Sequence, residues 1–230
     1  MKTIFRFFPN LLALLFILLV FGSCRTLNLA ELTPENRNEH LLPDLTPEVD
    51  VSIIEGRKAW SSTSRTEVIS DNSPNSTIIE TVTDSRPLTP ASTDIITLFE
   101  RDVNANIINP YGENKGQIVC KIVAYDANYY NSGLRVISTL TFGFFNLFGM
   151  PFDCKSASYD IEVNILNNER EKIGQYSAVG KAKVYSALFY GFDDASSIRL
   201  SRIRAFKNAM NKVKEQINCD YEQLNMALKD

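Results

Sequence analysis

The stretch Tyr159-Asp-Ile-Glu-Val-Asn-Ile165 decides the fold. Apolar and polar residues alternate strictly along it, and it begins and ends on an apolar residue. Because successive side chains of a strand point to opposite faces of a sheet, this pattern predicts a strand with one buried and one solvated face. Asn167-Asn168-Glu169 follows and tolerates a tight turn, and Lys172 to Val184 supplies a partner strand. The sequence therefore predicts an antiparallel hairpin.

Two amphipathic helices are predicted outside this hairpin. The first follows Ser92 or Thr93 as a possible N-cap and stops before Pro110. The second is longer and covers Ala195 to Asn218, with a short helix at Tyr221 to Leu228 after it. Apolar residues recur at three- and four-residue spacing in both, at Ile95, Ile96, Phe99, Val103 and Ile107, and at Ile198, Ala205, Phe206, Ala209, Met210, Val213 and Ile217.

Further strands are predicted before the hairpin. Gly116 to Tyr125 alternates, and Val51 to Trp60 is a plausible first strand. Thr66 to Ser70 and Thr77 to Thr83 flank a cluster of Asn, Pro and Ser and suggest another hairpin. The fold class is therefore predicted as α+β, a mainly antiparallel sheet packed by a long C-terminal helix and a second helix, with a hydrophobic insertion.

Residues 1–23 are predicted to be a lipoprotein signal peptide. Lys2 and Arg6 precede an apolar run from Leu11 to Phe21, which at 11 residues is short for a membrane span of about 20. The sequence Phe21-Gly22-Ser23-Cys24 is similar to the bacterial lipobox, which implies a mature N-terminus at Cys24 carrying fatty-acyl chains such as palmitate. Ordinary secretory cleavage near Ser23 is the alternative.

Residues 24–50 are interpreted as the lipidated cysteine and a tether, because Pro34, Pro43 and Pro47 lie in a stretch without periodicity. Residues 51–230 are then expected to form a single α+β domain. In Gram-negative lipoproteins an acidic residue after the cysteine favours the inner membrane. Arg25 stands there instead, so we expect an outer-membrane anchor facing the periplasm.

The net charge of −3 and the isoelectric point near 5.4 disfavour nucleic acid as a partner. Basic residues gather between Arg199 and Lys214 at helical spacing. We interpret them mainly as a solvated helix face, with a patch for anionic lipid or glycan as the alternative.

Cys120, Cys154 and Cys219 remain if Cys24 is lipidated, and three thiols allow at most one internal disulfide. Cys120 and Cys154 could pair in an oxidising periplasm or stay as buried thiols, and both possibilities stay open. The chain has no C-x-x-C spacing, so neither a zinc site nor a thioredoxin-like redox site is indicated.

Residues 133–152 form the most apolar segment of the predicted mature chain and carry one charge, Arg135. The favoured interpretation is a buried helix and turn that fill the core. The second is a loop that exposes Phe142, Phe144, Phe145 and Phe148 to the membrane or to a partner protein. A transmembrane helix is the least favoured, because Gly143, Gly149 and Pro151 interrupt the segment.

Enzyme chemistry is poorly supported. The single histidine, His40, lies in the predicted tether, so no histidine-based nucleophilic arrangement is available in the domain. Dinucleotide-binding, Walker, metalloprotease and EF-hand motifs are absent from the sequence. Asp193-Asp194 is the best carboxylate pair, but adjacent acids before a helix more often act as N-terminal caps. We expect no catalytic residues, no cofactor and no metal.

Four features together resemble uncharacterised Gram-negative envelope lipoproteins over roughly residues 40–218. They are Leu98-Phe-Glu-Arg-Asp-Val103, Asn146-Leu-Phe-Gly-Met-Pro151, the alternating strand at Tyr159, and Tyr190-Gly191 before the last long helix. That group offers no known activity to carry over. We expect a non-catalytic interaction or assembly module at the outer membrane with an envelope protein partner. The alternative is a lipid- or glycan-binding protein at the membrane surface.

Overall fold

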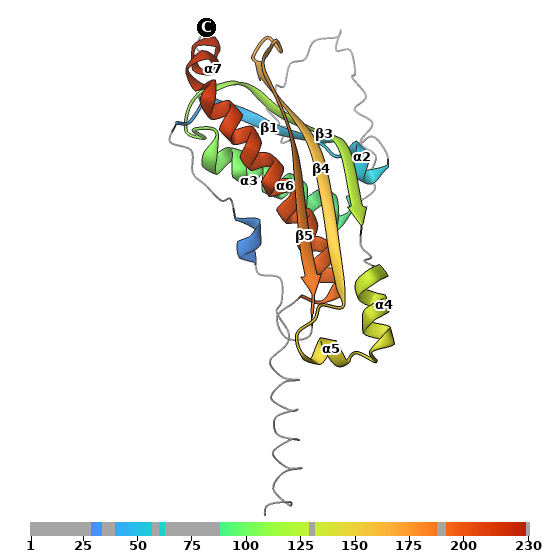
Figure 1. The fold of residues 1–230 in the computed structure, drawn as a ribbon. Helices are drawn as coiled ribbons and strands as arrows, with labels where there is room; N and C mark the ends of the chain where they lie inside the picture. Colours follow the sequence, from blue (N-terminus) through green and yellow to red (C-terminus); the bar gives the residue numbers. More distant parts are fainter. Residues whose placement is uncertain are drawn as a thin grey trace, which may run out of the picture. The chain divides into compact units, whose positions relative to one another are not determined.

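The computed structural model describes residues 29–33, 40–56, 60–62, 88–128, 132–187 and 192–228 (Figure 1). The chain divides into two compact units. Unit 1 consists of Met1–Thr33, Asp126–Tyr159 and Gly180–Asn208. Unit 2 consists of Pro34–Tyr125, Asp160–Val179 and Ala209–Asp230. The predicted hairpin at residues 66–83 lies outside the described residues.

A five-stranded sheet has the order β2-β1-β3-β4-β5, formed by β1 (Asp44–Asp50), β2 (Trp60–Ser62), β3 (Asn114–Asn128), β4 (Asp153–Asn167) and β5 (Lys172–Ser186). β1 is parallel to β3 and antiparallel to β2, and β4 is antiparallel to β3 and β5 (Figure 1). The helices are η1 (Leu29–Leu32), α2 (Ser52–Glu55), α3 (Pro90–Asn106), α4 (Ser132–Leu140), α5 (Phe144–Leu147), α6 (Asp194–Cys219) and α7 (Tyr221–Ala227). The α+β class, the mainly antiparallel sheet and the long C-terminal helix are confirmed.

The alternating strand has the predicted two faces. Tyr159, Ile161, Val163 and Ile165 of β4 are fully buried, whereas the residues between them are partly exposed. In the turn after β4, the Asn167 side-chain oxygen accepts the backbone N–H groups of Glu169 and Glu171 at 3.0 and 2.8 Å. The residue in the left-handed region is Arg170, with φ of 63°, which lies one position beyond the predicted turn residues.

The predicted tether and first strand are wrong in their bounds. The chain joins unit 2 by His40, whose ring stacks on that of Tyr221 with centroids 4.9 Å apart. β1 then covers Asp44–Asp50, and the expected strand from Val51 begins with the α2 turn instead. Pro47 lies opposite Ile118 of β3, between pairs on both sides of it, so the parallel pairing of β1 with β3 continues past the proline. The pairs with the described part of β2 begin only at Glu48, so the missing N–H of Pro47 disturbs no bond to β2.

In unit 2, α3 packs against β1 and begins one turn earlier than predicted. Its N-cap is Thr89, whose side-chain oxygen accepts the Ser92 N–H at 3.4 Å, and Pro90 occupies the first helical position. The part of α6 that belongs to unit 2 contributes Met210, Val213 and Ile217 to the core. All three are buried, as the predicted apolar stripe requires.

Side chains of α6 cover the outer edge of β5. In unit 2, Lys212 and Gln216 donate to the backbone carbonyls of Val179 and Ser177 at 2.7 and 3.1 Å. In unit 1, Asn208 donates to the carbonyl of Lys181 at 2.9 Å. Four residues of helix rise about 6 Å, close to the rise of two strand residues, so one helix face meets alternate carbonyls. These carbonyls are therefore not available for pairing with another strand.

Candidate functional site

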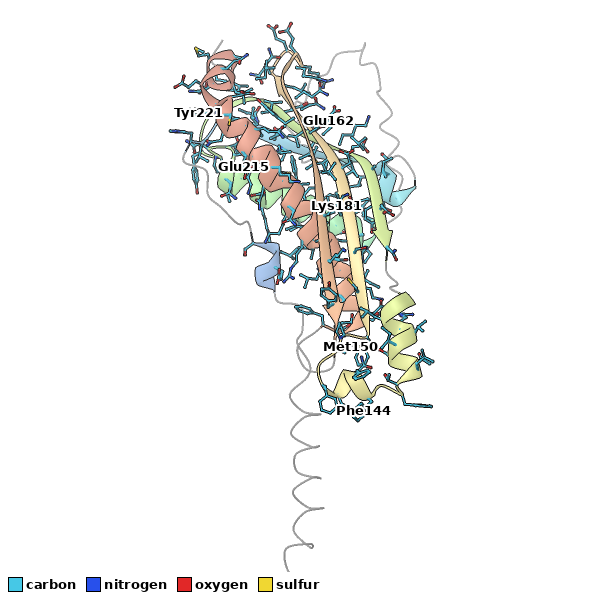
Figure 2. The ribbon with its side chains drawn as sticks, in the orientation of Figure 1. Phe144, Met150, Glu162, Lys181, Glu215 and Tyr221 are labelled. Carbon is cyan, nitrogen blue, oxygen red and sulfur yellow. The ribbon has the colours of Figure 1, made fainter. Side chains whose placement is uncertain are left out.

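α4 and α5 lie in unit 1 beyond the ends of β4 and β5, and Phe144 points outward there (Figures 1 and 2). We call Val136 to Phe148 the aromatic tip. The favoured prediction of a buried segment is wrong, because Phe142 is 99% exposed and seven further apolar side chains of the tip are exposed. These are Val136, Ile137, Leu140, Phe144, Phe145, Leu147 and Phe148. Their exposure agrees with the second interpretation of the insertion.

Three aromatic rings of the tip, those of Phe144, Phe145 and Phe148, contact one another on the exposed surface. Phe144 lies edge-on to Phe148 with ring centroids 5.0 Å apart, and to Phe145 at 6.1 Å. From Val136 to Phe152 the chain carries no Asp, Glu, Lys or Arg. A contiguous exposed apolar surface of this kind usually marks an interaction site.

The turn between α4 and α5 is a Schellman motif with an unusual residue at its centre. The Gly143 N–H donates to the Ser138 carbonyl at 2.7 Å and the Phe142 N–H donates to the Thr139 carbonyl at 3.1 Å. This pattern places Phe142 at the C′ position, where φ is 48° and where glycine is usual. A left-handed residue with a side chain costs about 1–2 kcal/mol. The Phe142 ring is almost fully exposed, so its burial does not offset this strain energy.

α5 ends in a second Schellman motif with the usual residue. The Met150 N–H donates to the Phe145 carbonyl at 3.0 Å, and the Gly149 N–H donates to the Asn146 carbonyl at 3.1 Å. Gly149 has φ of 93° at C′. The buried Asn146 side chain donates to the Met150 carbonyl at 2.9 Å. Both chain reversals of the tip are therefore fixed by internal hydrogen bonds.

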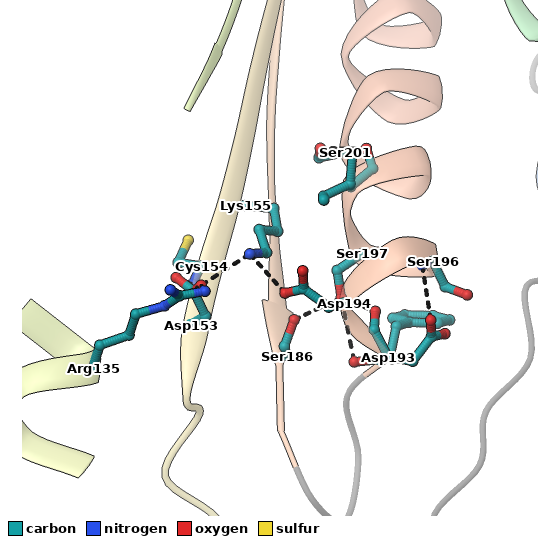
Figure 3. Close-up of polar contacts among 12 residues, drawn as sticks. Arg135, Asp153, Cys154, Lys155, Ser186, Asp193, Asp194, Ser196, Ser197 and Ser201 are labelled. Atoms are coloured by element: carbon teal, nitrogen blue, oxygen red, sulfur yellow. Dashed lines mark hydrogen bonds and ion pairs between the residues drawn. The ribbon is translucent and has the colours of Figure 1, made fainter. Parts of the chain in front are cut away.

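A cluster of charged side chains joins the tip to the strand that follows it (Figure 3). Arg135 of α4 donates through Nε and Nη2 to Oδ2 of Asp153, at 2.8 and 2.6 Å. Asp153 is the first residue of β4 and is almost fully buried, and its Oδ1 accepts the Cys154 N–H at 2.8 Å. We call Arg135, Asp153, Lys155 and Asp194 the ionic clamp.

Lys155 is the buried centre of the ionic clamp. Its Nζ lies 2.9 Å from Asp153 Oδ2 and 2.7 Å from Asp194 Oδ1, and its side chain is fully buried. Burial lowers the pKa of Lys155, but hydrogen bonds and charge attraction from Asp194 and Asp153 outweigh it and raise the pKa overall. Lys155 therefore stays protonated and connects β4 to the first turn of α6.

The Asp193-Asp194 pair is divided between two roles. Asp193 caps α6, since its Oδ2 accepts the Ser196 N–H at 3.2 Å and its carbonyl accepts the Ser197 N–H at 2.8 Å. The hydrogen bond from Ser196 lowers the pKa of Asp193, against the effect of burial. Asp194 instead contacts Lys155. The capping interpretation is confirmed for Asp193.

The basic residues of α6 do not form the solvated face that was expected. Lys207 and Lys214 are buried, and Lys214 Nζ lies 2.8 Å from Asp102 in unit 2. In unit 1, Arg204 Nη2 lies 3.0 Å from Glu31 of η1, and Lys207 donates to the Glu31 carbonyl at 3.4 Å. These charges hold elements of the chain together, so η1 is fixed on α6 with Leu32 buried.

The three cysteines of the folded part are unpaired. Cys120 and Cys154 are buried and Cys219 is exposed. Burial, helped by the negative charge of Asp50, raises the pKa of the Cys120 thiol far above its usual range. Of the two possibilities left open, the buried thiol therefore applies to Cys120 and Cys154. Cys24 lies outside the described residues.

The ionic clamp is the feature that sequence reasoning missed. Lys155 precedes the alternating part of β4 and resembles an ordinary strand lysine, and its partner Asp194 lies far along the chain. A hint was present in the charged residue Arg135 at the border of an otherwise uncharged segment. Such a residue often pairs with a counter-charge where the apolar segment joins the fold.

Within the described ranges, no group of three or more His, Cys, Asp or Glu side chains is placed to hold a metal ion. In the same part of the chain, no helix is both long and apolar enough to cross a membrane. No known protein-family model matches this chain, and no curated protein is significantly similar to it. The resemblance to envelope lipoproteins thus stays a prediction.

Proposed function

We propose that this chain is a lipid-anchored envelope lipoprotein that works as a non-catalytic interaction module, with the aromatic tip as its contact surface. The observation that carries the proposal is the full exposure of Phe142 in a left-handed conformation. Backbone strain at an exposed apolar residue is costly for the isolated fold, and such strain concentrates at functional positions.

The ionic clamp supports this function, because a contact surface must be held firmly on its scaffold. Arg135 and Asp153 fix α4 to β4, and Lys155 and Asp194 fix β4 to α6. A loose apolar loop would lose conformational entropy on binding, whereas a pre-organised one loses less. The four charges sum to zero and contact one another, which suits a structural role.

The anchor is part of the proposal. Lipidation at Cys24 would hold the protein on the outer membrane, facing the periplasm, and no nucleic acid is expected to bind. Either an envelope protein or the bilayer itself can cover an exposed aromatic surface, so the first test must detect both.

The test is photo-crosslinking in living cells from p-benzoylphenylalanine at Phe144. The same group at Tyr111, an exposed aromatic residue of unit 2, is the control. We expect adducts, whether lipid or protein, to form several-fold more efficiently from position 144. The double variant Phe144→Ser, Phe145→Ser should keep its circular dichroism spectrum. Equal, sparse adducts at both positions would contradict an interaction function for the tip.

A further inference from the structure

We infer that the occupant of the aromatic tip is the bilayer that carries the Cys24 anchor, into whose interfacial region the tip inserts. This inference rests on the proposed function and names what its contact surface meets. Three observations carry it, namely the short reach of the anchor, the internal hydrogen bonds of the two chain reversals and the threonine hydroxyls of the tip, and the absence of charge.

The anchor holds unit 1 close to the membrane. Cys24 lies five residues before Leu29, so the chain between them spans at most about 17 Å even when extended. η1 is fixed on α6 through Glu31 and Arg204. Arg204 lies ten residues beyond Asp194 in α6, about 15 Å along the helix axis. An acylated Cys24 can therefore reach the level of the ionic clamp, beside which the tip lies.

The two chain reversals and the threonine hydroxyls of the tip are hydrogen-bonded internally, which suits a lipid environment. Ser138 Oγ and Asn146 Oδ1 are buried without a partner among the described residues, but both lie beneath the exposed surface of the tip. Besides the backbone bonds of the two Schellman motifs, the threonine hydroxyls turn inward. Thr139 Oγ1 donates to the Arg135 carbonyl at 2.9 Å and Thr141 Oγ1 donates to the Ile137 carbonyl at 2.8 Å. A protein interface usually includes a polar rim with intermolecular hydrogen bonds. The O–H donors of Thr139 and Thr141 are already bound within the helix, so neither hydroxyl has a proton left to donate to a partner, and this favours lipid over protein.

The segment proposed to insert has no charged residue, and the charged residues Arg135 and Asp153 stand directly before and after residues 136–152. Arg135, the nearest cation, is half exposed and bound to Asp153, so it can lie at the level of the lipid headgroups while the residues after it enter the apolar region. Aromatic and leucine side chains on an uncharged face are typical of elements that lie in the membrane interface. The exposed set of Leu140, Phe142, Phe144, Leu147 and Phe148 has this composition.

The test uses the acylated protein, reconstituted in vesicles of phosphatidylethanolamine and phosphatidylglycerol that carry an alkyne on one acyl chain. p-Benzoylphenylalanine is placed at Phe148, or at Tyr111 as the control. After irradiation, the alkyne reports covalent lipid adducts on the protein. We expect several-fold more lipid adduct at position 148 than at 111, and a loss of that difference when Phe142 and Phe144 are both replaced by Ser.

The outcomes separate the inference from the proposed function. If position 148 gives no more lipid adduct than position 111, while position 144 crosslinks to a protein in cells, the occupant is a protein and the inference is overturned alone. If neither position 148 nor position 144 gives specific adducts, both the membrane-insertion inference and the proposed interaction function are contradicted. The double Ser variant must keep its circular dichroism spectrum. If it unfolds, the single Phe144→Ser variant decides, and an unchanged lipid adduct in it counts against the inference.

Discussion

Phe142 and Gly149 occupy the same C′ position in two consecutive Schellman motifs, with φ of 48° and 93°. Gly149 suits this backbone conformation, whereas Phe142 does not. The tip therefore places an aromatic side chain, fully exposed, where the local backbone favours none. Substitutions at Phe142 and Gly149 can therefore distinguish an effect on the folding stability of the tip from an effect on the binding of its partner.

Replacing Phe142 by Gly should keep or raise the stability of the protein and weaken the contact made by the tip. Relief of the left-handed strain should contribute about 1–2 kcal/mol, partly offset by the greater freedom of glycine in the unfolded chain. Urea unfolding followed by circular dichroism checks the stability, and crosslinking from position 148 checks the contact.

Gly149→Ala is the matched control for Phe142→Gly. It introduces a side chain at an equivalent left-handed position and should cost about 1 kcal/mol of unfolding free energy. If Phe142→Gly destabilises the protein as much as Gly149→Ala does, the Phe142 ring stabilises the fold, and its exposure is not a functional feature.

The contrast between Phe142 and Lys155 shows what the sequence could and could not predict. β4 and α6 were predictable, because complete burial of one face imposes a period of two or of three to four residues on the sequence. The exposure of the tip was not, since a run of phenylalanines has the same composition in a core as on a surface. The burial of Lys155 depends on Asp194, which no local pattern links to it. β1 was missed because Pro47 interrupts its strand signal.

Lys155 should be the most sensitive charged residue of unit 1. Lys155→Ala removes a cation that contacts the buried carboxylate of Asp153, and removing one member of a buried ion pair costs about 3 kcal/mol. Urea unfolding at neutral pH should show this loss as a lower midpoint.

Arg135→Gln should behave differently from Lys155→Ala, because Arg135 is half exposed and Asp153 keeps Lys155. We expect little change in the unfolding midpoint but faster proteolysis within residues 132–152, since α4 loses its contact with β4. Equal loss of global stability in both variants would show that the ionic clamp does not separate the tip from the rest of unit 1.

Gly116→Ala should prevent normal folding of unit 2. A Cβ at Gly116 would overlap the backbone carbonyl oxygen of Leu166, and Gly116 has φ of 153°, where side chains are rare. Backbone overlap cannot be relieved by a side-chain rotation, so β3 would have to move away from the end of β4. Low yield or a strongly lowered melting temperature is expected. Gly56→Ala is the control, because its Cβ would meet no atom within 4 Å, although its φ of 64° carries a moderate strain.

The lowered pKa of Asp193 predicts that the free energy of unfolding decreases in acid. Its pKa is lowered in the folded state, chiefly by the hydrogen bond from Ser196, so folding favours the ionised form. The resulting stabilisation is present above the unfolded pKa of about 4 and is lost as the pH falls through the lower folded value. Urea midpoints at pH 6 and pH 3 should therefore differ less in Asp193→Asn than in the unmodified protein. An identical difference in both proteins would show that the cap does not contribute.

Cys24→Ser tests the anchor itself when residues 1–23 are replaced by a cleavable secretory signal. Each acyl methylene contributes about 0.8 kcal/mol of membrane affinity, so the lipid chains should outweigh the exposed side chains of the tip. The variant should be recovered mainly in the soluble periplasmic fraction. If it remains in the membrane pellet, Phe142→Ser and Phe148→Ser are added. Release by these two changes would identify the tip as a second anchor, whereas continued retention would show that neither Cys24 nor the tip holds the protein on the membrane.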